Sequence, residues 1–148
     1  MAAGRRHRAR VAALQALYEA DSSHHPALDA LKRIAVEQRL PEGSRAFAQD
    51  LIQAVLAQQD ETDKVIARAA PAWPVEQLSP VDRNILRLAI TEMLGDNGTP
   101  VRAVINEAVE LAKSFGSENS AKFVNGVLGA IERQRSELQG AQRADGRG

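Results

Sequence analysis

Apolar residues recur along this chain with the spacing of amphipathic helices. In the segment 101–115 they are separated by steps of four, three, four and three, at Val101, Ile105, Ala108, Ala112 and Phe115. That spacing forms one stripe of a helix. Alanine, leucine, arginine, glutamine and glutamate dominate the rest, and β-branched runs with alternating polarity are missing. The pattern predicts an all-α protein.

The pattern predicts about seven helices, and prolines or glycines fall at most of the breaks between them. The helices are expected near residues 5–20, 27–38, 44–59, 61–70, 80–94, 101–115 and 118–136. A chain of 148 residues is typical of one domain. We therefore expect a single helical domain over 1–136, with a basic N-terminal arm at 1–10. The polar, glycine-punctuated segment 137–148 is expected to be a disordered tail.

Local signals define several helix ends. Ser79 is the expected N-cap of the fifth helix, with Pro80 at its first position and Asp82 as a weak capping-box partner. Gly116 is expected to end the sixth helix in a left-handed conformation. Ser117 would then cap the last helix, with Glu118 in its first turn.

Two further features carry packing predictions. Gly126 and Gly129 lie inside the last helix, where each glycine costs about 1 kcal/mol relative to alanine. That cost predicts close approach of a neighbouring helix. Trp73 is expected to anchor the extended connector 71–74 on the core.

Charge is balanced overall but concentrated at the N-terminus. The formal net charge is zero, yet residues 1–10 contain no acidic side chain and carry Arg5, Arg6, His7, Arg8 and Arg10. Arginine is unfavourable at the positive end of a helix dipole unless an anion binds there. The arm therefore indicates binding to RNA or DNA. The alternative is a solvated, frayed terminus.

A second basic group lies where the sixth and seventh helices meet. It combines lysine with aromatic rings at Lys113, Phe115, Asn119, Lys122 and Phe123. Single-stranded RNA is bound by such combinations, because bases stack on rings and phosphates meet lysine. Both phenylalanines also fit the apolar stripes of their helices, and Asn119 also fits a helix cap.

Three segments in the same order resemble the NusB family of bacterial transcription antitermination factors. They are RRHRARVAALQALYEAD at 5–21, LSPVDRNILRLAITEML at 78–94 and INEAVELAKSFGSENSAKFVNGVLG at 105–129. The resemblance implies an all-α fold of two packed helical halves with the fifth helix at the centre. It also implies that the basic arm helps to hold boxA, a short single-stranded RNA element of ribosomal RNA leaders. Relatives often carry Asp at position 119, and Asn there repels phosphate less.

The resemblance further implies a protein-binding face. The residues that would line it are Tyr18, Glu76, Asp82, Arg83 and Arg87. Their partner would be the small-subunit ribosomal protein that acts as NusE, and both would join the RNA polymerase antitermination complex. Tyrosine and arginine are frequent anchors of protein interfaces. Asp82 also fits a simple helix cap, and Arg87 also fits a simple ion pair.

Other functional classes find little support in the sequence. The chain has no cysteine, and His7, His24 and His25 lack the spacing of a metal site. No phosphate-binding loop or nucleophile motif occurs, so we expect no catalytic residues, no cofactor and no enzyme activity. No apolar run reaches the length of a membrane span, and we expect a cytoplasmic protein.

The sequence therefore predicts an RNA-binding antitermination factor, and it leaves alternatives open. One is the accessory domain of a ribosomal RNA methyltransferase, which would require a catalytic domain in the same reading frame. Another is a protein-interaction module that works without RNA. Binding of the first helix to an anionic membrane is a weaker alternative, because that helix has few bulky apolar residues. The resemblance is compatible with a monomer or a homodimer.

Overall fold

The computed structural model describes residues 3–145, and it describes side chains over residues 4–136. This part of the chain contains helices and no strand, which confirms the all-α prediction. The helices are α1 (Ala3–Ser23), α2 (Ala27–Glu37), α3 (Glu42–Ala69), α4 (Pro80–Leu94), α5 (Val101–Phe115) and α6 (Ser120–Asp145). A short 3₁₀-helix, η1 (Val75–Gln77), precedes α4.

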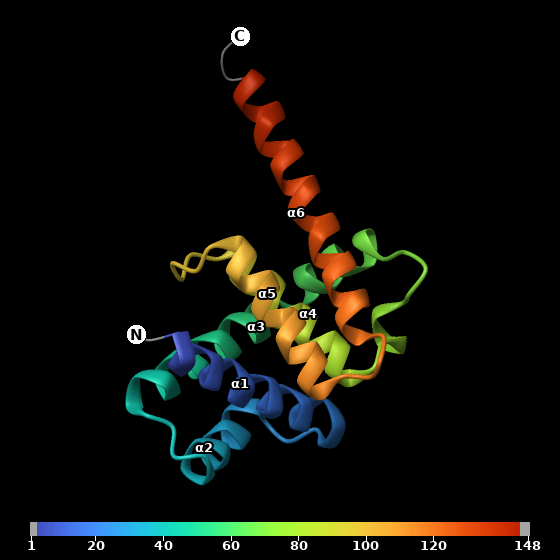
Figure 1. Ribbon diagram of the computed structural model, residues 1–148. Coiled ribbons are helices and arrows are strands. Elements are labelled where there is room, and N and C mark those ends of the chain that lie inside the picture. The colour runs from blue at the N-terminus through green and yellow to red at the C-terminus, as the bar shows by residue number, and fades with distance from the viewer. Residues whose placement is uncertain (1–2, 146–148) are drawn as a thin grey trace.

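The helices form two halves that meet at α3 and α4 (Figure 1). Helices α1 and α2 pack together on one side, and α5 and α6 pack together on the other. Helix α4 touches α1, α3, α5 and α6, so it lies at the centre of the molecule. Its residues Ile85, Leu86 and Ile90 are completely buried. The central position expected for this helix is therefore correct.

Helix α3 is one unbroken helix where the sequence predicts two. The break expected near residue 60 is absent, and the helix runs from Glu42 to Ala69. The sequence has no proline or glycine between 44 and 69, so nothing local stops the helix. Burial of Thr62 and Ile66, at 3% and 0% exposure, keeps the second part of α3 on the core.

The predicted cap of α4 is confirmed, but the break between α5 and α6 differs from the prediction. The Ser79 hydroxyl accepts a hydrogen bond from the Asp82 N–H. Gly116 has a φ of −92° and is extended rather than left-handed. Helix α6 begins at Ser120, and the Ser117 N–H donates to the Ser120 hydroxyl at 2.9 Å. The residue before Ser120 is Asn119, so Ser117 is not the N-cap of α6.

The glycines inside α6 do not mark a close helix contact. A Cβ atom at Gly126 would meet nothing within 4 Å, and one at Gly129 would meet only the Arg133 side chain, at 3.5 Å. The prediction of close approach is wrong at both positions. Close approach occurs instead at Gly116, where a Cβ would lie 2.7 Å from the Ala112 carbonyl oxygen and within 2.4 Å of the Ser120 side chain.

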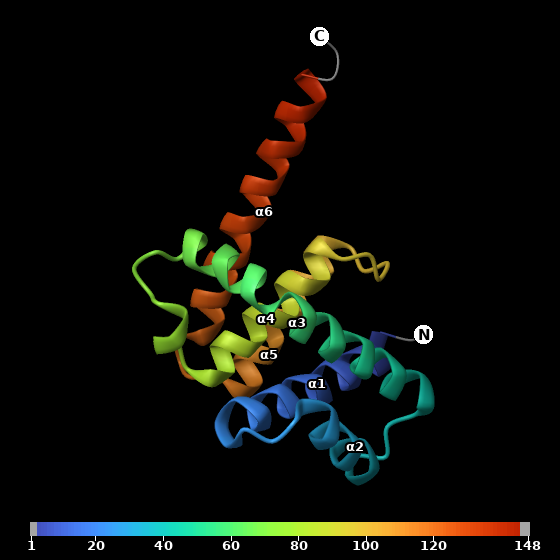
Figure 2. The ribbon, with the colours of Figure 1, turned by 180° about the vertical axis from the view of Figure 1, so that it is seen from behind.

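The C-terminal part of helix α6 projects away from the rest of the molecule in both views (Figures 1 and 2). It continues to Asp145, through most of the segment 137–148 for which the sequence predicts a disordered tail. Leucine, glutamine, alanine and arginine in this segment favour helix locally. Residues 146–148 of the predicted tail lie outside the described residues. Within the described part of the chain, no helix has the length and apolar character needed to cross a membrane.

Candidate functional site

The basic arm is held against the body of the protein by its own arginines. Arg6 donates from Nη1 to the Thr99 hydroxyl at 2.9 Å, in the loop between α4 and α5. Arg8 donates from Nη2 to the Gln38 carbonyl at 2.7 Å, at the end of α2. Arg5 is exposed and makes no hydrogen bond or ion pair with the described residues. Residues 3–10 of the arm thus form the first turns of α1, and Arg6 and Arg8 tie them to the body of the protein, unlike a frayed terminus.

Arg10 is buried, unlike the other arginines of the arm. It is 4% exposed and pairs with Glu92 through two hydrogen bonds of 2.9 and 2.7 Å. Burial disfavours its charge, but the hydrogen bonds that Arg10 donates to Glu92 and the charges of Glu92 and Glu107 outweigh burial and raise the pKa of Arg10. The guanidinium groups of Arg6 and Arg10 lie 5.0 and 5.2 Å from the centre of the Phe47 ring. Because Arg10 is buried, its position favours a role in holding the arm in place over the predicted direct contact with RNA.

His7 is partly exposed to solvent and also contacts α5. Its Nδ1 lies 3.1 Å from Glu107 Oε1, and the same oxygen lies 3.5 Å from Arg10 Nη1. One carboxylate therefore contacts both basic side chains on this side of α1. The arm and the first half of α5 are joined by this contact.

The second predicted group lies at the corner between α5 and α6, which we call the α5–α6 corner. Lys113, Asn119 and Lys122 are exposed, and Lys113 lies 3.3 Å from Glu110. Phe115 is 40% exposed, whereas Phe123 is partly buried. Two cations and an exposed ring therefore face solvent around one turn, as binding to a single strand requires.

A groove of about 780 Å³ separates the α5–α6 corner from the connector before α4. The corner contributes Asn119, Lys122 and Phe123 to its lining, and the connector contributes Trp73. Trp73 is 60% exposed and meets Phe123 edge to face, with ring centres 6.3 Å apart at 75°. The prediction that Trp73 anchors the connector on the core is wrong, because the core is closed by smaller residues such as Val75 and Leu78.

Phe115 lies in a different hollow from Phe123. It lines a groove of about 610 Å³ between α1 and α2, together with Tyr18 and Val81. The exposed tyrosine of the predicted protein-binding set is therefore a neighbour of the predicted RNA-binding set. The two predicted surfaces meet at this groove.

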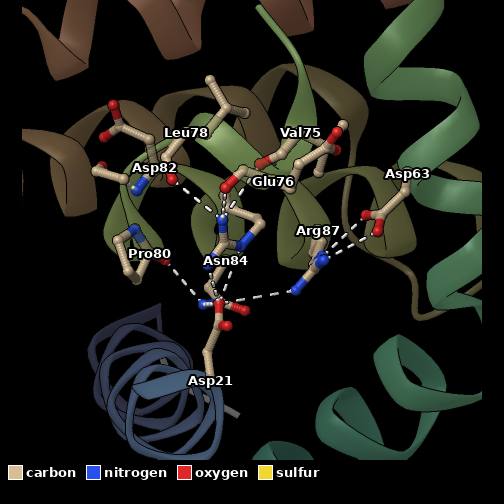
Figure 3. Close-up of polar contacts among 11 residues, drawn as sticks. Asp21, Asp63, Val75, Glu76, Leu78, Pro80, Asp82, Asn84 and Arg87 are labelled. Atoms are coloured by element: carbon tan, nitrogen blue, oxygen red, sulfur yellow. Dashed lines mark hydrogen bonds and ion pairs between the residues drawn. The ribbon is translucent and has the colours of Figure 1, made fainter.

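The arginines of the predicted protein-binding set sit in a network of ion pairs (Figure 3). Arg83 donates to one oxygen of Asp21 from Nε and Nη2, at 2.9 and 2.7 Å. Its Nη1 also donates to backbone carbonyls around η1, at 3.0 Å in the case of Leu78. Arg87 forms two bonds of 2.9 Å with Asp63 on α3. The network ties α1, α3 and η1 to α4.

Asp21 is the acidic centre of this network. Burial disfavours its charge, but hydrogen bonds from Arg83 and Asn84 and the charges of Arg83 and Arg87 outweigh burial and lower its pKa. Glu76 is exposed and lines a charged hollow together with the more buried Arg83 and Arg87. Asp82 faces the Trp73 groove, and its Oδ1 is buried without a hydrogen-bond partner among the described residues. The five predicted residues are thus spread over three adjoining hollows.

The model of the NusB family matches residues 7–133.

The chain belongs to the NusB family.

Curated relatives and solved structures agree with this NusB membership. A protein named transcription antitermination protein NusB, from Dehalococcoides mccartyi strain CBDB1, is 51% identical over 128 residues, covering 86% of this chain and 90% of the relative. The NusB protein of Roseiflexus castenholzii is 45% identical and covers 91% of this chain and 97% of its own.

Solved NusB structures share the fold as well. T. maritima NusB is 34% identical with a TM-score of 0.80, covering 86% of this chain and 90% of that one. A chain from a crystal structure of NusB and NusE in complex with dsRNA is 27% identical with a TM-score of 0.82, covering 90% of this chain and 99% of that one.

Sequence reasoning missed several residues that shape this NusB site. Asp21 and Asp63 hold the two arginines of α4, and Glu92 holds Arg10. A signal for the first pair was present in the sequence. Arg83 and Arg87 are four residues apart on a helix that is apolar on most of its surface, and buried arginines require acidic partners. The sequence carries no comparable signal for the exposure of Trp73.

Proposed function

We propose that this chain is a bacterial transcription antitermination factor that binds boxA-type RNA jointly with a small-subunit ribosomal protein acting as NusE. The bound pair would act on elongating RNA polymerase in the cytoplasm. The relatives named above are transcription antitermination proteins, and a related structure holds NusB with NusE and RNA. The chain would act by binding and would catalyse no reaction.

The observation that carries the RNA part of the proposal is the exposure of cations around one turn of the α5–α6 corner. Lys113, Phe115 and Lys122 are all exposed at this corner. Arg5 and Arg8 add exposed charge at the other end of α1. We propose that these four cations meet phosphates and that Arg10 positions the arm from within. Arg6 and His7, which are half-buried, would border the same path.

The protein part of the proposal rests on the hollows beside this path. Tyr18 is 44% exposed in the groove it shares with Phe115. Glu76 and the partly exposed Asp82 present carboxylates nearby, while Arg83 and Arg87 are mostly engaged with Asp21 and Asp63. We propose that the ribosomal protein contacts Tyr18, Glu76 and Asp82 directly. Arg83 and Arg87 would shape this face through the network that they form.

Binding of a labelled boxA-like RNA tests the proposal. The titration compares this RNA with a scrambled strand and with a duplex of the same length, each with and without the ribosomal protein. We expect boxA-like RNA to bind more tightly than both controls and to bind more tightly still when the partner is present. Equal weak binding to all three RNAs, unchanged by the partner, would reject the proposal in favour of a protein-interaction module.

A further inference from the structure

Trp73 is a large aromatic side chain that lies mostly exposed instead of packing into the core. It is the only tryptophan in the chain and is 60% exposed. Its contact with Phe123, 6.3 Å between ring centres and nearly perpendicular, uses only part of the indole. A large exposed ring at the rim of an apolar groove is typical of a binding surface.

The opposite wall of the groove is left open by a glycine. Gly126 lines the groove on α6, and a Cβ built on it would meet nothing within 4 Å. The only charged side chains in the lining are Lys122 and Asp82. Lys122 is exposed and forms no ion pair with the described residues, whereas Asp82 is partly buried with one oxygen hidden from solvent. Lys122 is therefore the more exposed of the two charged groups in the groove.

We propose that this groove holds one unpaired base of the single-stranded RNA, stacked on the indole of Trp73, with an adjacent phosphate at Lys122. The inference rests on the proposed function and adds a base-binding position to it. An exposed indole suits a base, because every base has a flat aromatic face. The groove is also continuous with Asn119 and Phe123 of the α5–α6 corner, so a strand lying along that corner reaches it.

The single tryptophan makes occupancy of the groove directly observable. When the chain is produced with 5-fluorotryptophan, its ¹⁹F spectrum contains one protein resonance, from position 73, even in the presence of a partner protein. We expect single-stranded boxA-like RNA to shift this resonance in step with binding measured by the anisotropy of labelled RNA. Because the ribosomal protein is proposed to contact Asp82, which also lines the groove, we expect this protein alone to shift the resonance less than RNA does.

Three results of this experiment would contradict the inference in different ways. RNA that binds by anisotropy without moving the resonance would overturn the base-binding position and leave the proposed function intact. A resonance moved by the ribosomal protein and not by RNA would make the groove a protein-docking site instead. Failure of RNA to bind with or without the partner would overturn the proposed function itself.

Variants separate stacking from charge. We expect Trp73→Ala to weaken RNA binding about tenfold without changing its salt dependence, and Trp73→Phe to retain most of the affinity. Lys122→Ala should instead lower the salt slope by about 0.7, as for the loss of one phosphate contact with a single strand.

A matched pair on α6 tests the groove itself. Gly126→Leu fills the open wall, whereas Asn125→Leu adds the same side chain at the neighbouring exposed position, which does not line the groove. We expect Gly126→Leu to weaken RNA binding as Trp73→Ala does, and Asn125→Leu to bind as the unmodified chain. Equal effects of the two leucines, or unchanged binding by both Trp73→Ala and Gly126→Leu, would overturn the inference.

Discussion

Arg10 and Glu92 form a buried ion pair between the first and fourth helices, with side chains only 5% and 2% exposed. The pair spans 82 positions of sequence. Asn97 donates to the same carboxylate at 2.8 Å and accepts from the Thr99 N–H, which in turn places the Thr99 hydroxyl beside Arg6. The orientation of the basic arm therefore depends on a carboxylate that does not itself reach the surface.

Loss of Arg10 alone should be more damaging than loss of the whole pair. Arg10→Ala leaves the Glu92 charge buried without its main partner, and we expect a loss of about 3–5 kcal/mol in the free energy of unfolding. The double variant Arg10→Met with Glu92→Leu should lose much less, because apolar side chains replace both charges. Urea unfolding followed by circular dichroism measures both. A single variant as stable as the double variant would show that leaving Glu92 without Arg10 carries no extra cost.

The arginines of the arm should differ in how they affect RNA binding. Arg5→Ala and Arg8→Ala should each reduce the salt slope of RNA binding by about 0.7, since each removes one phosphate contact with a single strand. The Arg10→Met, Glu92→Leu double variant should reduce the slope less than Arg5→Ala does, because it removes no exposed cation. The measurement is a series of titrations at increasing salt concentration. A slope reduced by the double variant as much as by Arg5→Ala would return Arg10 to the RNA-contacting set.

The Asp21 network should make stability depend on acid pH. The folded-state pKa of Asp21 lies below its ordinary value of 3.8, so its contribution is fully present above that value and is lost as the pH falls through the folded pKa. We expect Asp21→Asn to be less stable at neutral pH and to lose less stability between pH 5 and about pH 2. Unfolding curves across that range measure the difference, and parallel losses in the two proteins would exclude Asp21 as a source of the dependence.

Two glycines near the α5–α6 corner should respond in opposite ways to alanine. Gly126→Ala places a methyl group in open space, so the better helix propensity of alanine should raise stability by up to about 1 kcal/mol. Gly116→Ala forces its Cβ against the Ser120 side chain and the Ala112 carbonyl, and should cost about 1–3 kcal/mol. Thermal unfolding of the two variants provides the comparison. Destabilisation by both would mean that backbone freedom, rather than space, governs Gly126.

Helix positions were predictable from the sequence because they depend on local chemistry. The stripe of α5 and the Ser79 cap of α4 need only neighbours within a few residues. The break predicted within α3 was wrong because the continuity of that helix also depends on packing between distant parts of the chain. A polar stretch near residue 60 resembles a boundary, although it contains no proline or glycine, and the packing of Thr62 and Ile66 on the core keeps this part in the helix.

The sequence was enough to predict which residues form the candidate site, but not what each of them does there. The cluster of basic residues in the arm was evident, yet the pattern could not separate exposed Arg5 from buried Arg10. The distinction comes from Glu92, whose proximity is a property of the assembled fold. Trp73 shows the reverse case, since a lone tryptophan between prolines is expected inside a core and here lies on the surface.

The continuity of α3 has a consequence for how the molecule comes apart. A helix of 28 residues is about 42 Å long, and this one packs on α1 and α2 as well as on α4 and α6. Each half of the protein uses part of the same helix as a wall. Unfolding of either half would expose apolar surface on the helix that supports the other half. The two halves should therefore unfold together in a single cooperative transition.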